Sequence, residues 1–358
     1  MEANLLRLLP SAPAQVDLFA LSLILIQATL LYKIARKAEA LRGPRLVAAA
    51  RSVRANQVAQ REVAVQRRER KMSLGSLDER QRGMLERARA VYTKEGDALD
   101  DLWEPFLLRF FVSAEWNEAE ALRRMIATAE WRRKVGAAAV RQKFASGGFK
   151  VGAHPAMARM LNAMGIAMCH RRTKDGDLLQ LGHVGAFDPD LWLRTMTDDE
   201  FTDLGLHFCE YLGYTADALS AAEKRLVRQA FVLDYDGMGW RHLNMSIFLR
   251  LQPQIAIMAT YYPEMIGSAT CVNAPSLFSF LWGIVSPGLS DNMRQRVQTV
   301  TEDETHAALA RLAPADALPR TLGGECDELP ADVRDALGLD AAAARLRGFY
   351  DREAWRRG

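Results

Sequence analysis

Residues 261–300 read YYPEMIGSATCVNAPSLFSFLWGIVSPGLSDNMRQRVQTV, and this stretch decides the fold. A polar turn, Tyr262-Pro263-Glu264, leads to a short run at 268–273. Pro275 marks a break between a strand and a helix. An apolar segment at 276–285 follows, and a second strand-like run at 296–300 closes the stretch. The pattern predicts a strand, a helix and a second strand.

The apolar segment has the spacing of a helix with one apolar face. Phe278, Leu281, Trp282 and Val285 recur at intervals of three and four residues, which places them on one side of a helix. A face this apolar does not lie in water without a function.

The motifs in and around this stretch resemble those of the CRAL-TRIO lipid-binding family, the group of phosphatidylinositol/phosphatidylcholine transfer proteins. The resemblance covers about residues 76–326, and its motifs occur in the family's order. Besides the apolar helix, which corresponds to a mobile gate, they are Leu107-Leu108-Arg109-Phe110, Glu130-Trp131-Arg132, the segment Val232 to Met238, Tyr262-Pro263-Glu264, Asn273-Ala274-Pro275 and the segment Leu318 to Gly324.

The resemblance implies an α/β fold in two lobes. Residues 76–147 would form a helical N-terminal lobe, residues 148–326 a lipid-binding domain with a mixed, mostly parallel sheet flanked by helices, and residues 327–358 a helical tail. The sequence itself predicts helices at 77–92, 100–112, 117–135, 198–212, 220–229, 244–260 and 332–357, the first of them starting at the cap-like residue Ser76.

Strand-like runs alternate with helical segments in the second lobe, which favours a mostly parallel or mixed sheet. The first two runs flank Lys174-Asp175-Gly176, a turn suited to a hairpin. The predicted strands are 165–171, 178–184, 231–234, 268–273 and 296–300.

The resemblance also implies an apolar pocket that is floored by the sheet and closed by the gate helix. The bound lipid would then be the only ligand, without a cofactor, a metal or a catalytic residue. Residues of these types also fill ordinary cores, so only the pocket would make them ligand contacts. The expected wall residues are Phe231, Leu233, Ile257 and Cys271, and the expected gate residues are Phe278, Leu281, Trp282 and Val285.

Glu264 and Arg296 are the polar candidates. In the family, the glutamate of this turn and a later basic residue help to hold a phosphoinositide head group. A guanidinium can bind phosphate through two hydrogen bonds, so Arg296 suits that role. The same two residues also suit a purely structural salt bridge between turn and strand. Both interpretations stay open at this point.

Other positions depart from the family pattern. Ala114-Glu115 and Met265 replace basic residues that would grip phosphate, and Gln229 and Phe231 replace the hydroxyl residues that hold phosphatidylcholine. These changes argue against phosphatidylcholine and leave phosphatidylinositol or a related phospholipid as the expected ligand. A neutral hydrophobic molecule, such as a tocopherol, retinoid or sterol, is the alternative.

The N-terminus predicts membrane attachment. Residues 18–32 carry no charge, and a helix of this length spans about 22 Å, less than the roughly 30 Å of a bilayer core. We expect an anchor within 1–33 that spans the membrane or lies at its interface, with the following chain on the cytoplasmic side. A signal or mitochondrial targeting sequence and a docking helix are the alternatives.

The basic charge of the chain is confined to one segment. The net charge is +3, yet residues 1–72 hold 13 Lys/Arg against 5 Asp/Glu, and the remainder holds 34 against 39. The basic linker is 34–75. The run from Lys33 to Lys71, which covers most of it, predicts an anionic membrane surface as the partner. A solvated helical linker is the alternative. Nucleic acid is not expected, because aromatic residues are nearly absent from the run.

Other features of the sequence argue against a metal site, a nucleotide-binding loop and an enzyme active site. The four cysteines form no CxxC pair, the six histidines show no metal-binding motif, and there is no phosphate-binding GxxxxGK[ST] loop. No nucleophile is paired with a base, so we expect a lipid-binding or lipid-transfer protein and not an enzyme. A membrane-tethered regulatory or sensor module with a lipid pocket is the alternative, and the sequence does not identify a protein partner.

Overall fold

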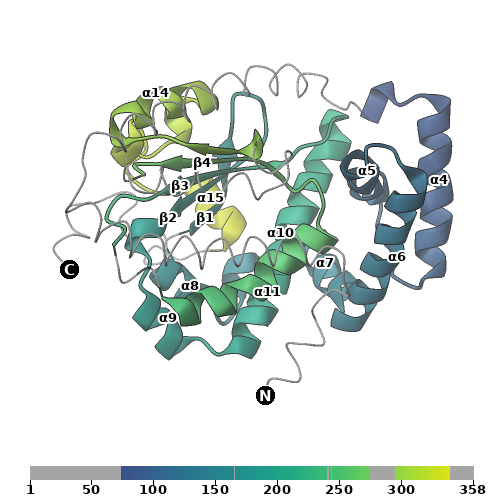
Figure 1. The fold of residues 1–358 in the computed structure, drawn as a ribbon, viewed down its shortest axis with the longest axis horizontal. Helices are drawn as coiled ribbons and strands as arrows, with labels where there is room; N and C mark the ends of the chain where they lie inside the picture. Colours follow the sequence, from purple (N-terminus) through teal and green to yellow (C-terminus); the bar gives the residue numbers. More distant parts are fainter. Residues whose placement is uncertain (1–73, 165, 240–241, 243, 275–294, 339–358) are drawn as a thin grey trace, which may run out of the picture.

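A computed structural model describes residues 74–164, 166–239, 242, 244–274 and 295–338 of the chain (Figure 1). Helices α4, α5 and α6 gather at one end of the molecule, and a five-stranded sheet with helices on both sides forms the other end. Helices α7 and α10 lie between the two parts in this view. The arrangement is the α/β fold with a mixed sheet that the sequence predicts.

The helical end is built from α4 (Glu79–Lys94), α5 (Trp103–Ser113) and α6 (Glu118–Val135), followed by α7 (Ala137–Ala145). These bounds confirm the three predicted helices. The predicted cap is wrong, because Ser76 lies in a short 3-10 helix, η1 (Leu74–Ser76). Asp78 is the cap, and its side chain and that of Gln81 each accept a hydrogen bond from the other residue's backbone N–H.

A compact apolar core holds these helices together. Burying one large apolar side chain contributes about 1.5–3 kcal/mol, so this cluster dominates the stability of the helical end. Its largest fully buried members are Leu85, Tyr92, Leu107, Leu108, Phe110, Phe111 and Met125.

The sheet has the strand order β1-β2-β3-β4-β5. The first pair is antiparallel and forms the predicted hairpin, and the other three pairs are parallel. Gly176 in the hairpin turn has φ +81°, a conformation that glycine adopts without strain. The strands are β1 (Ile166–Arg172), β2 (Leu178–His183), β3 (Gln229–Asp234), β4 (Ile266–Val272) and β5 (Val297–Thr299).

The register sorts the predicted pocket residues onto one face of the sheet. Leu233 pairs with Cys271, and Phe231 lies two residues before Leu233, so all three side chains point the same way. Val232 and Val272 point to the opposite face and belong to the main apolar core. Figure 1 shows α14 (Glu302–Leu312) on one side of the sheet and α10 on the other.

Helix α10 (Asp198–Glu223) is a single helix where the sequence predicts two. The sequence predicts separate helices at 198–212 and 220–229, but one helix runs through Gly213 and ends before the β3 strand. A glycine costs a helix about 1 kcal/mol, which tertiary packing can override. Gly213 is buried beside Met265 and Tyr262, where burial of the surrounding helix outweighs that cost.

Three further helices belong to the part of the molecule that contains the sheet. They are α8 (Met157–Met164), α9 (Pro189–Thr195) and α11 (Met245–Tyr261). The bounds of α11 confirm the predicted helix at 244–260, with Asn244 as its N-cap. Near the C-terminus, α15 (Ala331–Leu337) ends at Gly338, so the predicted tail helix is described only over its first residues.

Three predicted segments lie outside the described residues: the N-terminal anchor with the basic run to Lys71, the gate at 276–285, and the chain after residue 338. Within the part of the chain that the structure describes, no helix is both long and apolar enough to cross a bilayer.

Candidate functional site

The Glu264 carboxylate is held between two arginines. Its Oε2 accepts hydrogen bonds from Nε and Nη2 of Arg228 at 2.9 and 2.8 Å, and its Oε1 pairs with Nη2 of Arg296. The side chain of Glu264 is only 4% exposed, while Arg228 and Arg296 are partly exposed. The structure therefore brings the two predicted head-group residues together and adds a third.

Electrostatics keep Glu264 charged. Burial alone would raise the pKa of its carboxyl, but Arg296 and Arg228 outweigh burial and lower that pKa below its ordinary value of 4.5. The carboxylate is therefore ionised at neutral pH. An ionised carboxylate in this place is an acceptor for hydroxyl or ammonium donors, and the arginines beside it are donors for anions.

Two buried contacts fix the turn that carries Glu264. Its φ of +56° lies in the left-handed region, which is uncommon for a residue other than glycine. Arg109 donates from Nη1 to the Glu264 carbonyl at 3.0 Å, and the hydroxyl of Tyr262 donates to Oε1 of Glu210 at 2.5 Å. Helices α5 and α10 thus anchor the turn.

Arg228 is a residue that the sequence reasoning missed. It directly precedes β3, and its backbone is pinned because its N–H donates to Asp177 and its carbonyl accepts from Leu178. The available signal was a lone basic residue before a strand, which is too common to point to Glu264.

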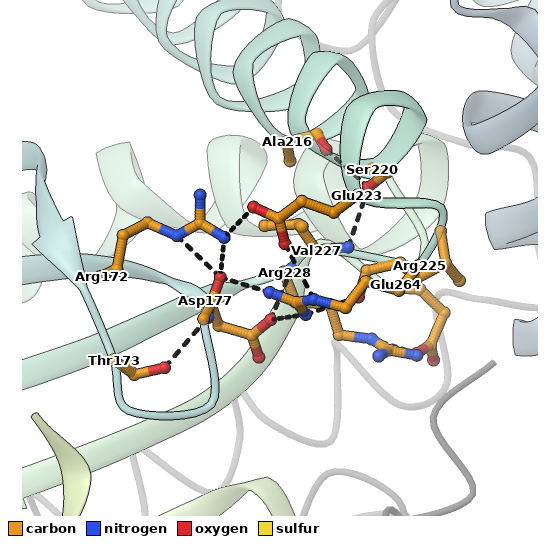
Figure 2. A network of polar contacts seen from close by, with 12 residues as sticks. Arg172, Thr173, Asp177, Ala216, Ser220, Glu223, Arg225, Val227, Arg228 and Glu264 are labelled. Atoms are coloured by element: carbon orange, nitrogen blue, oxygen red, sulfur yellow. Dashed lines mark hydrogen bonds and ion pairs between the residues drawn. The ribbon is translucent and has the colours of Figure 1, made fainter. Parts of the chain in front are cut away.

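More arginines continue the polar network beside the Glu264 cluster (Figure 2). Arg225 pairs with Asp177 at 3.2 Å and with Glu223 at 2.9 Å, and Arg172 also pairs with Glu223. These contacts join the β1–β2 hairpin to the C-terminal end of α10. Each acid in this group already has its own arginine, so the group is a structural frame beside the Glu264 cluster.

The predicted wall residues occupy different surroundings. Phe231 is half-buried and packs against the aromatic cluster of α10, α11 and the turn, which contains Ile257. Cys271 is buried, and its Sγ lies 4.0 Å from the hydroxyl of Tyr235. Leu233 is half-buried on the same sheet face. The predicted gate residues, Phe278, Leu281, Trp282 and Val285, lie outside the described residues.

Comparison with known proteins gives the family. Residues 162–324 match the CRAL/TRIO domain. The Sec14 cytosolic factor of Schizosaccharomyces pombe is 23% identical over 256 residues, which are 70% of this chain and 85% of that protein.

Residues 162–324 of this chain are a CRAL/TRIO domain. Proteins of the family are lipid-binding and lipid-transfer proteins and not enzymes. The protein real-time of Anopheles gambiae is 30% identical over 171 residues, 46% of this chain. A phosphatidylinositol/phosphatidylcholine transfer protein of Arabidopsis thaliana, SFH11, is 26% identical over 163 residues, 44% of this chain and 42% of that protein. The match spans only 25% of the mosquito protein.

The structure shows where the residues that depart from the family motifs lie. Glu115 is exposed in the turn after α5. Met265 is buried among the aromatic residues of the turn. Gln229 is fully buried, donates to the Leu212 carbonyl at 3.0 Å and accepts from Gln180 at 2.8 Å. Both side-chain hydrogen bonds of Gln229 are thus structural, because they join β3 to α10 and to β2.

His154 and His207 lie close together although the sequence shows no motif that predicts their contact. Nε2 of His154 lies 3.0 Å from a carboxylate oxygen of Asp203, and His207 lies one turn after Asp203 on α10. Nδ1 of His154 accepts the N–H of Ala156, so Nε2 carries the ring proton and donates it to Asp203. A metal-binding histidine needs the opposite tautomer at Nε2. The contact therefore fits a hydrogen bond between the two segments better than a metal site.

Proposed function

We propose that this protein holds one phospholipid, phosphatidylinositol or a close relative, and exchanges or presents it at the cytosolic face of a membrane. The acyl chains would lie on the sheet face of Phe231, Leu233 and Cys271. The head group would lie at Glu264 and Arg296. The predicted gate at 276–285 would close the pocket.

The observation that carries this proposal is the Glu264 cluster. A lipid with a phosphate and several hydroxyl groups needs cationic donors and a charged acceptor side by side. Arg228, Glu264 and Arg296 offer both at the end of an apolar sheet face. The relative from Arabidopsis thaliana, whose name gives phosphatidylinositol as a ligand, supports the same lipid class.

The energetics favour exchange at a membrane surface. Two acyl chains hold on the order of thirty methylenes at about 0.8 kcal/mol each, so a free lipid in water costs upwards of about 20 kcal/mol. A gate that opens only into a bilayer avoids that cost. The basic run from Lys33 to Lys71 would hold the protein near anionic lipid, at about 1 kcal/mol per basic residue near the surface.

A neutral hydrophobic ligand is the second candidate, because neither carboxylate oxygen of Glu264 is without an arginine. Two guanidiniums already pair with both carboxylate oxygens, as in a structural salt bridge. Met265 is buried in the aromatic cluster, so it leaves no cation at that position of the turn.

Native mass spectrometry of the gently purified full chain, followed by extraction of the bound lipid, tests the proposal. One phosphatidylinositol per chain is the expected result. A bound tocopherol, retinoid or sterol would favour the second candidate, and a chain that stays empty after exposure to mixed lipids would contradict both.

A second assay separates transfer from sensing. Donor vesicles containing fluorescent phosphatidylinositol are mixed with unlabelled acceptor vesicles and the full chain. Transfer faster than the spontaneous rate supports a carrier, and loading without transfer supports a membrane-tethered regulatory or sensor module.

A further inference from the structure

Among the residues that the structure describes, the cluster around Glu264 brings two guanidiniums to one carboxylate. One carboxylate faces Arg228 and Arg296, and its charge also acts on Arg124 of α6. Two neighbouring acids within the described part of the chain are engaged by other arginines. Asp177 pairs with Arg225, and Glu120 pairs with Arg123. An anion beside Arg228 would therefore be attracted by two guanidiniums.

Arg228 is the arginine best placed to receive that anion. Nε and Nη2 both point to a single oxygen of Glu264, and Nη1 makes no hydrogen bond to any residue that the structure describes. Its side chain is 24% exposed, more than that of Arg296 at 15%. A guanidinium with one edge engaged and the other open can bind a phosphate oxygen without breaking its first contact.

The backbone of Arg228 is unusually well fixed for a residue outside a strand. Its N–H donates to Asp177 at 3.1 Å, and its carbonyl accepts from Leu178 at 2.8 Å. The preceding carbonyl, that of Val227, accepts from the buried Arg109 at 2.9 Å. Such fixation lowers the entropy lost when the guanidinium binds a ligand.

We propose that Arg228 is a specificity-determining residue that binds the phosphate of the ligand's head group. This inference rests on the proposed function, and it assigns a cationic donor where Ala114, Glu115 and Met265 supply none. The phosphate ester that Arg228 recognises belongs either to an intact lipid or to a soluble inositol phosphate. Glu264 stays in place as the acceptor for the head group's hydroxyls.

The test compares loading of two ligands by the full chain. Phosphatidylcholine vesicles containing phosphatidylinositol and a fluorescent sterol are incubated with wild type, Arg228→Gln, Arg228→Lys and the control Arg320→Gln. Arg320 is also an arginine paired with a carboxylate, but it is exposed and pairs with Asp327. The measured quantity is the ratio of bound phosphatidylinositol to bound sterol, with circular dichroism as the check on folding.

We expect Arg228→Gln to lower that ratio about tenfold, as the loss of a charge-assisted hydrogen bond does. Arg228→Lys should give an intermediate ratio, because lysine keeps the positive charge but cannot form the two parallel hydrogen bonds of a guanidinium. Arg320→Gln should match wild type. An unchanged ratio in Arg228→Gln, or equal losses of both ligands, would overturn the inference. Wild type that takes up no phosphatidylinositol would instead refute the proposed function, and the inference with it.

A soluble inositol phosphate distinguishes the two phosphate sources. If it displaces phosphatidylinositol from wild type but not from the residual complex of Arg228→Gln, Arg228 binds the phosphate by itself. If the inositol phosphate displaces no phosphatidylinositol while the loading ratio still falls in Arg228→Gln, Arg228 binds the phosphate only as part of the intact lipid. Displacement that is equal in both proteins would contradict a role for Arg228.

Discussion

Arg109 on α5 donates a hydrogen bond of 3.0 Å from Nη1 to the main-chain carbonyl of Glu264, 155 residues further along the chain. The same buried guanidinium also binds Asp217 at 2.8 Å and the Val227 carbonyl at 2.9 Å. One side chain of the helical end thus fixes the turn of Glu264 and the segment that leads to Arg228. The helical end is therefore part of the framework of the proposed head-group site and not only a neighbouring lobe.

Replacing Arg109 by lysine should destabilise the protein strongly. An ammonium keeps the charge but cannot reach the three acceptors that the planar guanidinium binds at once. Breaking such a buried contact costs about 3–5 kcal/mol, and we expect a loss of that size in the free energy of unfolding, measured with urea. Arg123→Lys, on the surface of α6, is the control and should change it by less than about 1 kcal/mol. Equal effects of the two substitutions would contradict this role of Arg109.

The Glu264 ion pairs should make stability depend on acid pH. The folded-state pKa of Glu264 lies below its ordinary value of 4.5, so the ionised form stabilises the fold. That contribution is complete above about pH 4.5 and is lost as the pH falls through the folded-state pKa. We expect Glu264→Gln to lower the free energy of unfolding by about 1–3 kcal/mol at pH 7.

The measurement for Glu264→Gln is urea unfolding of both proteins between neutral and acid pH. The difference between them should be constant above about pH 4.5 and should shrink below it. A difference that grows as the pH falls would show that Glu264 is not held ionised by Arg228 and Arg296.

Much of the fold follows from local patterns in the sequence. The five strands, the hairpin at Gly176 and the helices α4, α5, α6 and α11 are all predicted, because periodicity and turn residues are local properties. The break in α10 was predicted wrongly, since burial beside Met265 and Tyr262 outweighs the helix cost of Gly213. Thr301 and the three acids after it are a start signal for α14 that the interpretation did not use.

The site was predictable only in part. A resemblance of motifs pointed to Glu264 and Arg296, and the structure brings their side chains together. Arg228 reaches Glu264 across 36 positions of the chain, because β3 and β4 are parallel neighbours in the sheet. Contacts of this kind depend on strand order and register, which one sequence does not specify. The same holds for the contact between His154 and Asp203.

The predicted gate can be tested without further structural detail. Phe278→Asp combined with Trp282→Asp places two charges on an apolar face that would have to enter a bilayer, at about 2.5–3.5 kcal/mol each. We expect the double variant to lose lipid loading from vesicles while its circular dichroism spectrum stays unchanged. Leu249→Asp is the control, because Leu249 on α11 is an exposed large apolar residue. Loading by the double variant at the wild-type level would show that 276–285 is not the gate.

Two buried cysteines offer a readout of pocket opening. Burial raises the pKa of both the Cys209 and the Cys271 thiols to about 12, so neither forms the reactive thiolate at neutral pH. Cys271 lies on the proposed pocket face of β4, whereas Cys209 is packed within the aromatic cluster of α10. Opening of the pocket should therefore expose Cys271 and leave Cys209 protected.

Alkylation by a small maleimide at neutral pH, followed by mass spectrometry of the peptides, measures this difference. In solution both cysteines should react slowly, and the partly exposed Cys326 should react first of the three cysteines whose side chains the structure describes. With phospholipid vesicles added, we expect the modification rate of Cys271 to rise while that of Cys209 does not change. The rise should be absent from the variant that carries Phe278→Asp and Trp282→Asp. Equal acceleration of Cys209 and Cys271 would indicate general loosening of the fold at the membrane, and no change in either would place Cys271 outside the path by which the lipid enters.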